Sequence, residues 1–133
     1  MSQGLPRTER VRRRREFERI YETGVRIHGR FMTVFLASNT SARPRVGVAA
    51  TRKLGSAVER NRAKRLAREL FRRNKLAAGL DIVIVPRREM LDAPFGTIEA
   101  DYLAALDRRD RERRRSEGPR PRGGRRSRPA SRV

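Results

Sequence analysis

Residues 60–73, with the sequence RNRAKRLARELFRR, constrain the chain most, because this stretch is both strongly cationic and regularly patterned. At about 3.6 residues per turn, its apolar side chains gather on one side of a helix. These are Ala63, Leu66, Ala67, Leu70 and Phe71. The opposite side carries Asn61, Arg65, Arg68 and Arg72, with Lys64 at its margin. Just upstream, Ser56 and Glu59 have the spacing of a capping box. The sequence therefore predicts a capped helix with a buried stripe and an outward cationic row.

The outward row of this helix carries predominantly one sign of charge. A solvated helix usually mixes signs on its outer face, because opposite charges at i and i+4 stabilise each other. Charges of one sign repel each other unless a polyanion neutralises them. The row therefore indicates a surface that binds nucleic acid.

The composition of the whole chain agrees with a polyanionic partner. Among 133 residues, 35 are Lys or Arg and 15 are Asp or Glu, which gives a formal net charge of +20. A chain of this length forms one domain, and such a charge favours nucleic acid or an anionic membrane surface. Only Lys53, Lys64 and Lys75 are lysines. Arginine binds phosphate in a bidentate manner and stacks on bases, although coding bias explains an arginine excess equally well.

Several classes of site are missing from the sequence. There is no cysteine, which excludes disulfides and thiolate metal sites. His28 is the only histidine, so no histidine pair can act as acid and base or bind zinc, and it reads as a plain surface residue. We expect no catalytic residue and no metal site in the protein itself. No signal peptide and no apolar run of roughly 18 residues is present, so we expect a cytoplasmic protein without a membrane partner.

The periodicity of the chain predicts an α+β fold in two layers, with the element order α-β-β-α-β-α. A flexible N-terminus over residues 1–10 precedes an RNA-binding domain over residues 11–107. Residues 108–133 carry 12 arginines and 3 acidic residues with almost nothing apolar, so we expect a disordered arginine-rich tail. The expected elements are a helix from Arg12 to Gly24, strands over 31–37 and 45–51, the central helix, a strand over 80–85, and a helix opened by Asp92 and Pro94.

Two relationships between these elements follow from the pattern. The turn residues that separate strands 31–37 and 45–51 predict a hairpin. The strand, helix and strand over residues 45–85 form a βαβ unit, which implies that its two strands are parallel. Gly47 and the small residues after it indicate that another element packs closely against that strand.

The first helix carries Phe17, Ile20 and Tyr21 at helical spacing, next to a dense arginine run. All three fit a buried core stripe. For Phe17 and Tyr21 a second interpretation stays open, because aromatic faces beside cations stack single-stranded bases.

The chain from Arg52 to Glu69, RKLGSAVERNRAKRLARE, resembles the signature of the bacterial ribonuclease P protein subunit. Further segments agree in order, and the resemblance covers roughly residues 10–107. They are RREF at 14–17, Tyr21, Gly24, residues 31–36, RVG at 45–47 and GLDIV at 79–83. The resemblance implies a fold like domain 2 of ribosomal protein S5 with a left-handed βαβ crossover, whereas general physics favours the right-handed form.

The resemblance also implies a function. The protein would bind the catalytic RNA of ribonuclease P and the 5′ leader of precursor tRNA, and would assist endonucleolytic removal of that leader. The RNA and its Mg²⁺ ions would perform the hydrolysis, the protein alone would bind no cofactor, and no obligate protein partner is expected. By position, the implied RNA-binding residues are Arg52, Lys53, Arg60, Asn61, Arg62, Lys64, Arg65 and Arg68. The implied leader-binding cleft consists of Phe17, Tyr21 and Phe35.

The sequence departs from the family pattern at two places. The segment 49–51 is less rich in hydroxyl groups than the family's strand end, and Ser56 replaces a frequent Asn. Three alternatives remain beside the ribonuclease P interpretation. A ribosomal or general RNA-binding protein would share the charge and fold without a role in processing. A self-sufficient nuclease would need the acid and base groups that are missing, and a DNA-binding module would need a helix-turn-helix.

Overall fold

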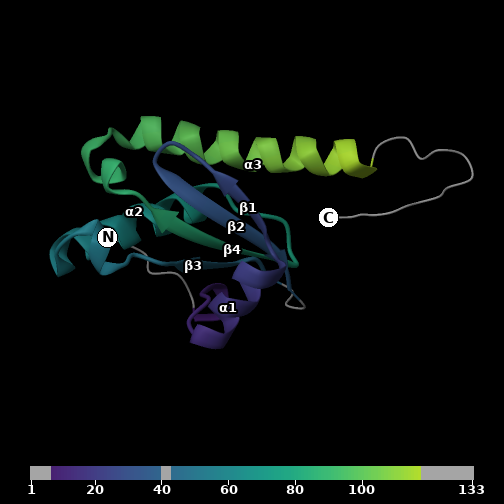
Figure 1. The fold of residues 1–133 in the computed structure, drawn as a ribbon, viewed down its shortest axis with the longest axis horizontal. Coiled ribbons are helices and arrows are strands. Elements are labelled where there is room, and N and C mark those ends of the chain that lie inside the picture. The colour runs from purple at the N-terminus through teal and green to yellow at the C-terminus, as the bar shows by residue number, and fades with distance from the viewer. Residues whose placement is uncertain (1–6, 40–42, 118–133) are drawn as a thin grey trace, which may run out of the picture.

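The computed structural model describes residues 7–39 and 43–117, and within them it contains one four-stranded sheet and three α-helices (Figure 1). In chain order the elements are the 3₁₀ helix η1 (Arg7–Glu9), α1 (Arg14–Thr23), β1 (Val25–His28), β2 (Met32–Ser38), β3 (Arg45–Val48), the 3₁₀ helix η2 (Arg52–Leu54), α2 (Ala57–Arg73), β4 (Leu80–Pro86), the 3₁₀ helix η3 (Arg88–Asp92) and α3 (Phe95–Glu117). The α+β class and the predicted element order are confirmed, with β1 as an additional strand. In the described ranges, no helix is long and apolar enough to cross a membrane.

The strand order of the sheet is β1-β2-β4-β3. β3 and β4 are parallel, as predicted for the βαβ unit. The predicted hairpin of β2 and β3 is wrong, because β4 lies between these strands and pairs with both. Five of the seven residues of β4 are buried, which suits a central strand that is covered on both faces. The hairpin is formed instead by β1 and β2. The handedness of the crossover stays a prediction from the resemblance.

The two faces of the sheet are covered differently. Alternate residues of β2 and β4, such as Val34 and Ile84, pack with Phe71 of α2 and Tyr102 of α3 in the main core. The other alternate residues, such as Val83, face α1 and pack with Ile20 in a smaller core. α2, α3 and the sheet thus form the predicted two layers, and α1 adds partial cover on the opposite face, as Figure 1 shows.

The start of α2 is the predicted capping box. Ser56 Oγ accepts a hydrogen bond from the Glu59 backbone N–H at 3.2 Å, and Glu59 Oε1 accepts one from the Ser56 N–H at 2.9 Å. Glu59 also accepts from Arg88 of η3 at 2.9 Å. The Arg88 hydrogen bond, followed by the bond from the Ser56 backbone, lowers the pKa of Glu59 from 4.5 to about 2. The helix start is therefore fixed both by its own residues and by a distant loop.

Local structure extends past both of the predicted domain boundaries. The N-terminus was expected to be flexible through residue 10, but Glu9 is buried and Arg10 pairs with Val46 at the edge of the sheet. The arginine-rich tail was expected from residue 108, but α3 continues to Glu117. Helix α3 lengthens because the residues after Asp107 are good helix formers despite their charge. The rest of the predicted tail, residues 118–133, and residues 1–6 lie outside the described residues.

Candidate nucleic-acid interface

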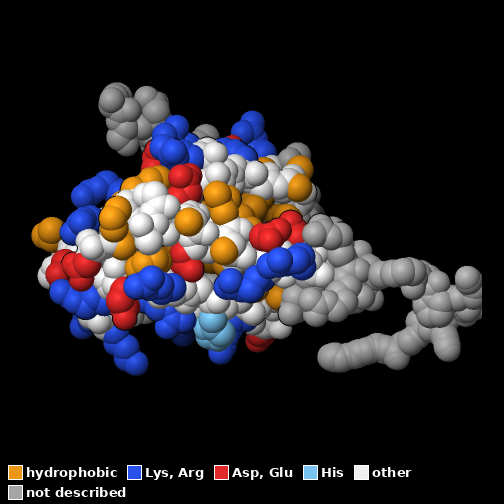
Figure 2. All heavy atoms as spheres, turned by 90° about the horizontal axis from the view of Figure 1, so that it is seen from above, with side chains coloured by type: hydrophobic (Ala, Val, Ile, Leu, Met, Phe, Trp, Pro, Cys, Tyr) orange, Lys and Arg blue, Asp and Glu red, His pale blue; other side chains and the backbone are white. Residues whose placement is uncertain are grey.

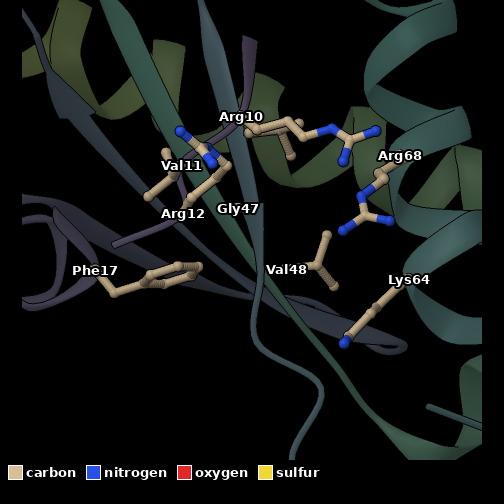
Figure 3. A pocket seen from close by; sticks show the side chains of 9 residues that line it. Arg10, Val11, Arg12, Phe17, Gly47, Val48, Lys64 and Arg68 are labelled. Atoms are coloured by element: carbon tan, nitrogen blue, oxygen red, sulfur yellow. The ribbon is translucent and has the colours of Figure 1, made fainter. Parts of the chain in front are cut away.

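A cleft of about 300 Å³ lies between the segment before α1, strand β3 and helix α2 (Figure 3). The ring of Phe17 forms one wall, and Lys64 and Arg68 extend from α2 on the other side. Val48 and Gly47 of β3 lie between the two walls. We call this feature the α1–α2 cleft. It joins an aromatic side chain to two cations that the sequence assigned to separate sets.

Among the described residues, four cationic residues and no acidic residue line the α1–α2 cleft: Arg10, Arg12, Lys64 and Arg68. Within the described part of the chain, Nε of Arg10 is buried without a hydrogen-bond partner. Burial lowers the pKa of Arg68, and the nearby charge of Arg10 lowers it further. Like charges held together without a counter-charge favour a bound anion. A phosphate group fits this arrangement, because arginine binds phosphate through several N–H groups.

The three predicted leader-binding residues form a continuous row of rings along one side of the sheet. The ring centroids of Phe17 and Tyr21 are 6.4 Å apart, and those of Tyr21 and Phe35 are 4.8 Å apart. Tyr21 is 39% exposed, whereas Phe17 and Phe35 are partly buried against the core beneath α1. Burial raises the pKa of the Tyr21 hydroxyl, so this group stays neutral at physiological pH. The rings therefore support α1, as the core interpretation predicts, and Tyr21 still presents an exposed surface, so base stacking stays a prediction.

The eight predicted RNA-binding residues fall into two groups. Arg60 donates from Nη1 to the Gly55 carbonyl at 2.9 Å, and Arg62 donates from Nη2 to the Leu91 carbonyl at 2.8 Å. Both therefore help to fix the ends of loops around α2. The other six side chains make no hydrogen bond or ion pair with any described residue. They are Arg52, Lys53, Asn61, Lys64, Arg65 and Arg68.

The cationic row on α2 is also less uniform than the sequence indicates. Arg72 is paired with Glu69 at 2.5 Å, which neutralises the end of the row. Lys64 and Arg68 point into the α1–α2 cleft, as Figure 3 shows, whereas Arg65 is exposed. α2 therefore presents cations both to the cleft and to its outer surface.

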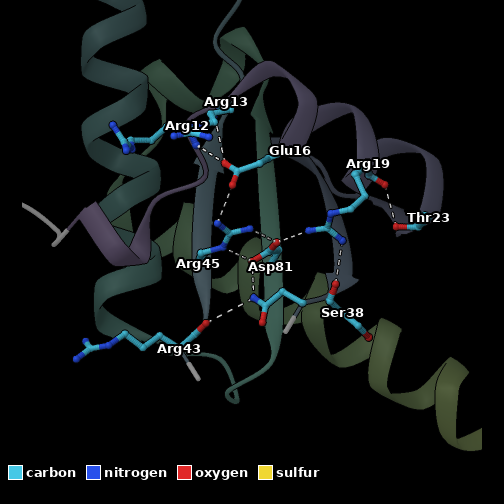
Figure 4. Close-up of polar contacts among 10 residues, drawn as sticks. Arg12, Arg13, Glu16, Arg19, Thr23, Ser38, Arg43, Arg45 and Asp81 are labelled. Atoms are coloured by element: carbon cyan, nitrogen blue, oxygen red, sulfur yellow. Dashed lines mark hydrogen bonds and ion pairs between the residues drawn. The ribbon is translucent and has the colours of Figure 1, made fainter. Parts of the chain in front are cut away.

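The position of α1, which carries Phe17, is fixed by a network of ion pairs around Asp81 (Figure 4). Asp81 is fully buried in β4 and accepts hydrogen bonds from Arg45 at 2.9 and 2.8 Å and from Arg19 at 2.6 Å. Arg45 also donates to Glu16 at 3.0 Å. Burial acts to raise the pKa of Glu16, but hydrogen bonds from the Arg13 N–H and from Arg45 outweigh it and lower the pKa. Arg19 and Arg45 thus have a structural role.

Nothing in the N-terminal arginine run distinguishes Arg10 and Arg12 as residues of the cleft. The structure places them there because Arg10 pairs with Val46, which brings the segment before α1 alongside β3 at the cleft. This contact joins residues far apart in the chain.

By contrast, the surface over α3 in Figure 2 mixes cationic, acidic and apolar side chains. Among the described residues, no three of His, Cys, Asp and Glu gather as metal ligands.

A comparison with known families decides what kind of RNA-binding protein this is. The sequence model of the family Ribonuclease P matches residues 5–110. The chain belongs to the ribonuclease P protein family. The ribonuclease P protein component of Thermotoga sp. (strain RQ2) is 36% identical over 114 residues, which cover 81% of this chain and 97% of that protein. The component from Desulfovibrio desulfuricans is 41% identical over 110 residues, 78% of this chain and 85% of that protein.

The solved structures agree with the family. The ribonuclease P protein from Thermotoga maritima superposes with a TM-score of 0.67 at 36% identity, over 75% of this chain and 96% of that chain. The chain is therefore the protein subunit of a ribonucleoprotein enzyme that processes precursor tRNA, and its partner is an RNA subunit. This membership confirms the resemblance and sets aside a ribosomal or general RNA-binding role.

Proposed function

We propose that this subunit divides its two partners between two surfaces. The outer cations of α2 and the loop before it dock on the catalytic RNA. The α1–α2 cleft and the row of Phe17, Tyr21 and Phe35 hold the single-stranded 5′ leader of precursor tRNA. The observation that carries the proposal is the junction of this aromatic row with a cleft that, in the part of the chain that the structure describes, is lined by cations and by no acidic residue.

The physical chemistry of the two surfaces supports this division. Stacking of a base on an aromatic side chain contributes about 1–3 kcal/mol and tolerates any base, which suits leaders of different sequence. Phosphate contacts add affinity that falls with salt, by a slope of about 0.7 per contact on a single strand. Exposed, unpaired cations such as Arg65 on α2 suit a folded RNA, whose surface presents phosphates.

The proposal assigns the hydrolysis to the catalytic RNA and its bound Mg²⁺. We assign no catalytic residue, no metal ligand and no cofactor to the protein, and we propose a cytoplasmic location. The protein would act by positioning the leader and by ordering RNA phosphates that hold the metal ions. The second effect predicts that the holoenzyme needs less Mg²⁺ than the RNA alone.

The experiment that tests the proposal is single-turnover cleavage of precursor tRNA by a ribonuclease P RNA at low Mg²⁺, with and without this protein. We expect faster cleavage with the protein, tighter binding of precursor than of mature tRNA, and no cleavage by the protein alone. Cleavage by protein freed of RNA would contradict the assignment of hydrolysis to the RNA. Equal affinity for precursor and mature tRNA would contradict the leader-binding role.

A further inference from the structure

The loop before α2 carries two exposed cations, Arg52 and Lys53, whose side chains make no hydrogen bond with any described residue. The next residue, Leu54, is buried and packs in one apolar cluster with Leu91 of η3. Arg88, also in η3, donates from Nη1 to the Leu54 carbonyl at 2.6 Å. The backbone that carries the two cations is therefore tied to η3 both by an apolar side chain and by a hydrogen bond.

The guanidinium of Arg88 also reaches the start of α2. Its Nη2 lies 2.9 Å from Glu59 Oε2, and its Nη1 lies 3.3 Å from Glu59 Oε1. Because a guanidinium is a planar fork with several donors, one side chain can hold a carbonyl and a carboxylate at the same time. We call the contacts of Arg88 with the Leu54 carbonyl and the Glu59 carboxylate the Arg88 bridge. The bridge joins the loop to the first turn of the helix.

Gly55 allows the Arg88 bridge to lie close to the backbone of the loop. Its φ is +149°, and a Cβ atom at this position would lie 2.7 Å from Arg88 Nη1. A residue with a side chain would be strained here and would displace the guanidinium. Arg60 of α2 donates to the Gly55 carbonyl at 2.9 Å. The turn that separates the loop cations from α2 is therefore fixed by side chains of both α2 and η3.

The exposure of the ion pair indicates that its effect is local. The side chains of Arg88 and Glu59 are 57% and 34% exposed, and exposed ion pairs contribute little to the stability of a whole fold. A fixed loop has a different consequence, because a mobile segment must be ordered when it binds and this ordering weakens the affinity. Glu59 also places an acid beside a surface that is proposed to face a polyanion, which by itself would repel the RNA.

We propose that Arg88 is a positioning residue for docking on the catalytic RNA: the Arg88 bridge holds the loop with Arg52 and Lys53 in its RNA-binding conformation, and Arg88 itself contacts no phosphate. This inference rests on the proposed docking surface and deepens it. It has an unusual consequence, because an acidic residue, Glu59, then raises the affinity of the protein for a polyanion.

The first test measures the dissociation constant for the catalytic RNA at several salt concentrations. Arg88→Ala should bind about tenfold more weakly with an unchanged slope of log K against log salt, because the phosphate contacts still form and only the cost of ordering the loop rises. Arg14→Ala is the matched control, since it removes the same charge from α1, where Arg14 pairs with Glu18 on the surface, and it should bind like the unsubstituted protein. A slope reduced by about one in Arg88→Ala would show a direct phosphate contact and overturn the proposal.

Glu59→Gln tests the proposal by the sign of its effect. Glutamine keeps the capping box with Ser56 but offers Arg88 a neutral acceptor, whose hydrogen bond is about half as strong. The variant should therefore bind the catalytic RNA about threefold more weakly, although it has lost a negative charge. Glu69→Gln is the control on the same helix and should bind at least as tightly as the unsubstituted protein, because the loss of an acid relieves repulsion. Equal or tighter binding by Glu59→Gln would overturn the proposal.

Hydrogen exchange in the free protein reports on the loop directly. The Gly55 N–H donates to the Arg52 carbonyl at 3.2 Å. It should exchange faster in Arg88→Ala, while amides in the middle of α2 keep their protection and show that the variant is folded. Unchanged exchange at Gly55 together with weaker RNA binding would mean that Arg88 acts on the RNA itself.

Arg52→Ala separates this inference from the proposed function. It should weaken binding to the catalytic RNA and reduce the salt slope by about one. If Arg52→Ala has this effect and Arg88→Ala binds like Arg14→Ala, the Arg88 bridge does not position the loop for docking. If Arg52→Ala has no effect, docking through this loop is itself wrong.

Discussion

The ring of Phe17 packs directly on the backbone of Gly47. A Cβ atom at Gly47 would lie 2.8 Å from two atoms of this ring and 2.9 Å from Cβ of Val11. Contacts under about 3 Å do not occur for real side chains, so only glycine permits this arrangement. The position of the Phe17 ring, which we propose to contact the leader, is therefore set by β3 as well as by its own helix.

Gly47→Ala should displace Phe17 and weaken the affinity for precursor tRNA about tenfold, while the affinity for mature tRNA and for the catalytic RNA stays unchanged. This tenfold loss of affinity corresponds to the loss of one stacked base. Equilibrium binding of precursor and mature tRNA to the holoenzyme measures it. Gly96→Ala is the control, since a Cβ at this position of α3 meets no described atom within 4 Å apart from its chain neighbours and the backbone of its own helix. Equal affinity of both variants for precursor would show that the ring position is unimportant.

Arg65→Ala should weaken binding to the catalytic RNA and reduce the slope of log K against log salt by about one, because one phosphate contact is lost. Arg65 is exposed on α2 and has no partner among the described residues. Arg72→Ala is the matched control on the same helix, because Glu69 already neutralises Arg72. Filter-binding titrations at several salt concentrations measure the slope for each variant. Identical slopes for the two variants would contradict docking through the unpaired cations.

The lowered pKa of Glu59 predicts how the stability of the protein depends on pH in the acidic range. Its pKa is lowered from 4.5 to about 2 by Arg88 and by the Ser56 backbone, so its charged form stabilises the fold above pH 4.5. That contribution is lost as the pH falls from 4.5 toward 2. Glu59→Gln should therefore flatten the fall in unfolding free energy over this range, as measured by urea denaturation. Glu22→Gln, at an exposed position without a partner in the described residues, should leave the profile unchanged.

The sequence predicted the elements of the fold better than their pairing. The stripe on α2, the capping box and the parallel βαβ unit follow from local spacing, and the structure contains all three. The hairpin was wrong because the turn residues before Arg45 indicate a reversal of the chain but not which strand becomes the neighbour. β1 was missed because Val25–His28 is short and only one of its residues, Ile27, is buried.

For the candidate site, the sequence predicted which residues to consider but not the partners of their side chains. Phe17, Tyr21 and Phe35 meet as expected from the resemblance. The role of an arginine depends on whether an acceptor lies beside it, and the acceptors come from distant segments. The Gly55 and Leu91 carbonyls accept hydrogen bonds from Arg60 and Arg62, for example, whereas Nε of Arg10 has no acceptor among the described residues. A run of identical cations offers no local signal for this difference.

Asp81→Asn should destabilise the protein by about 3 kcal/mol, because removing one partner of a buried ion pair leaves the other charge uncompensated. We expect a destabilisation in the lower part of the range for broken buried ion pairs, because the side chains of Arg45 and Arg19 are 18% and 40% exposed and keep some solvation. Asp110→Asn should lower the unfolding free energy by at most about 1 kcal/mol, because the Asp110 side chain, which pairs with Arg109, is 54% exposed. Urea denaturation measures both. The network also ties α1 to the sheet, so the folded Asp81→Asn variant should lose more affinity for precursor tRNA than for the catalytic RNA. An equal loss of affinity for both would show that Asp81 supports the fold without positioning Phe17.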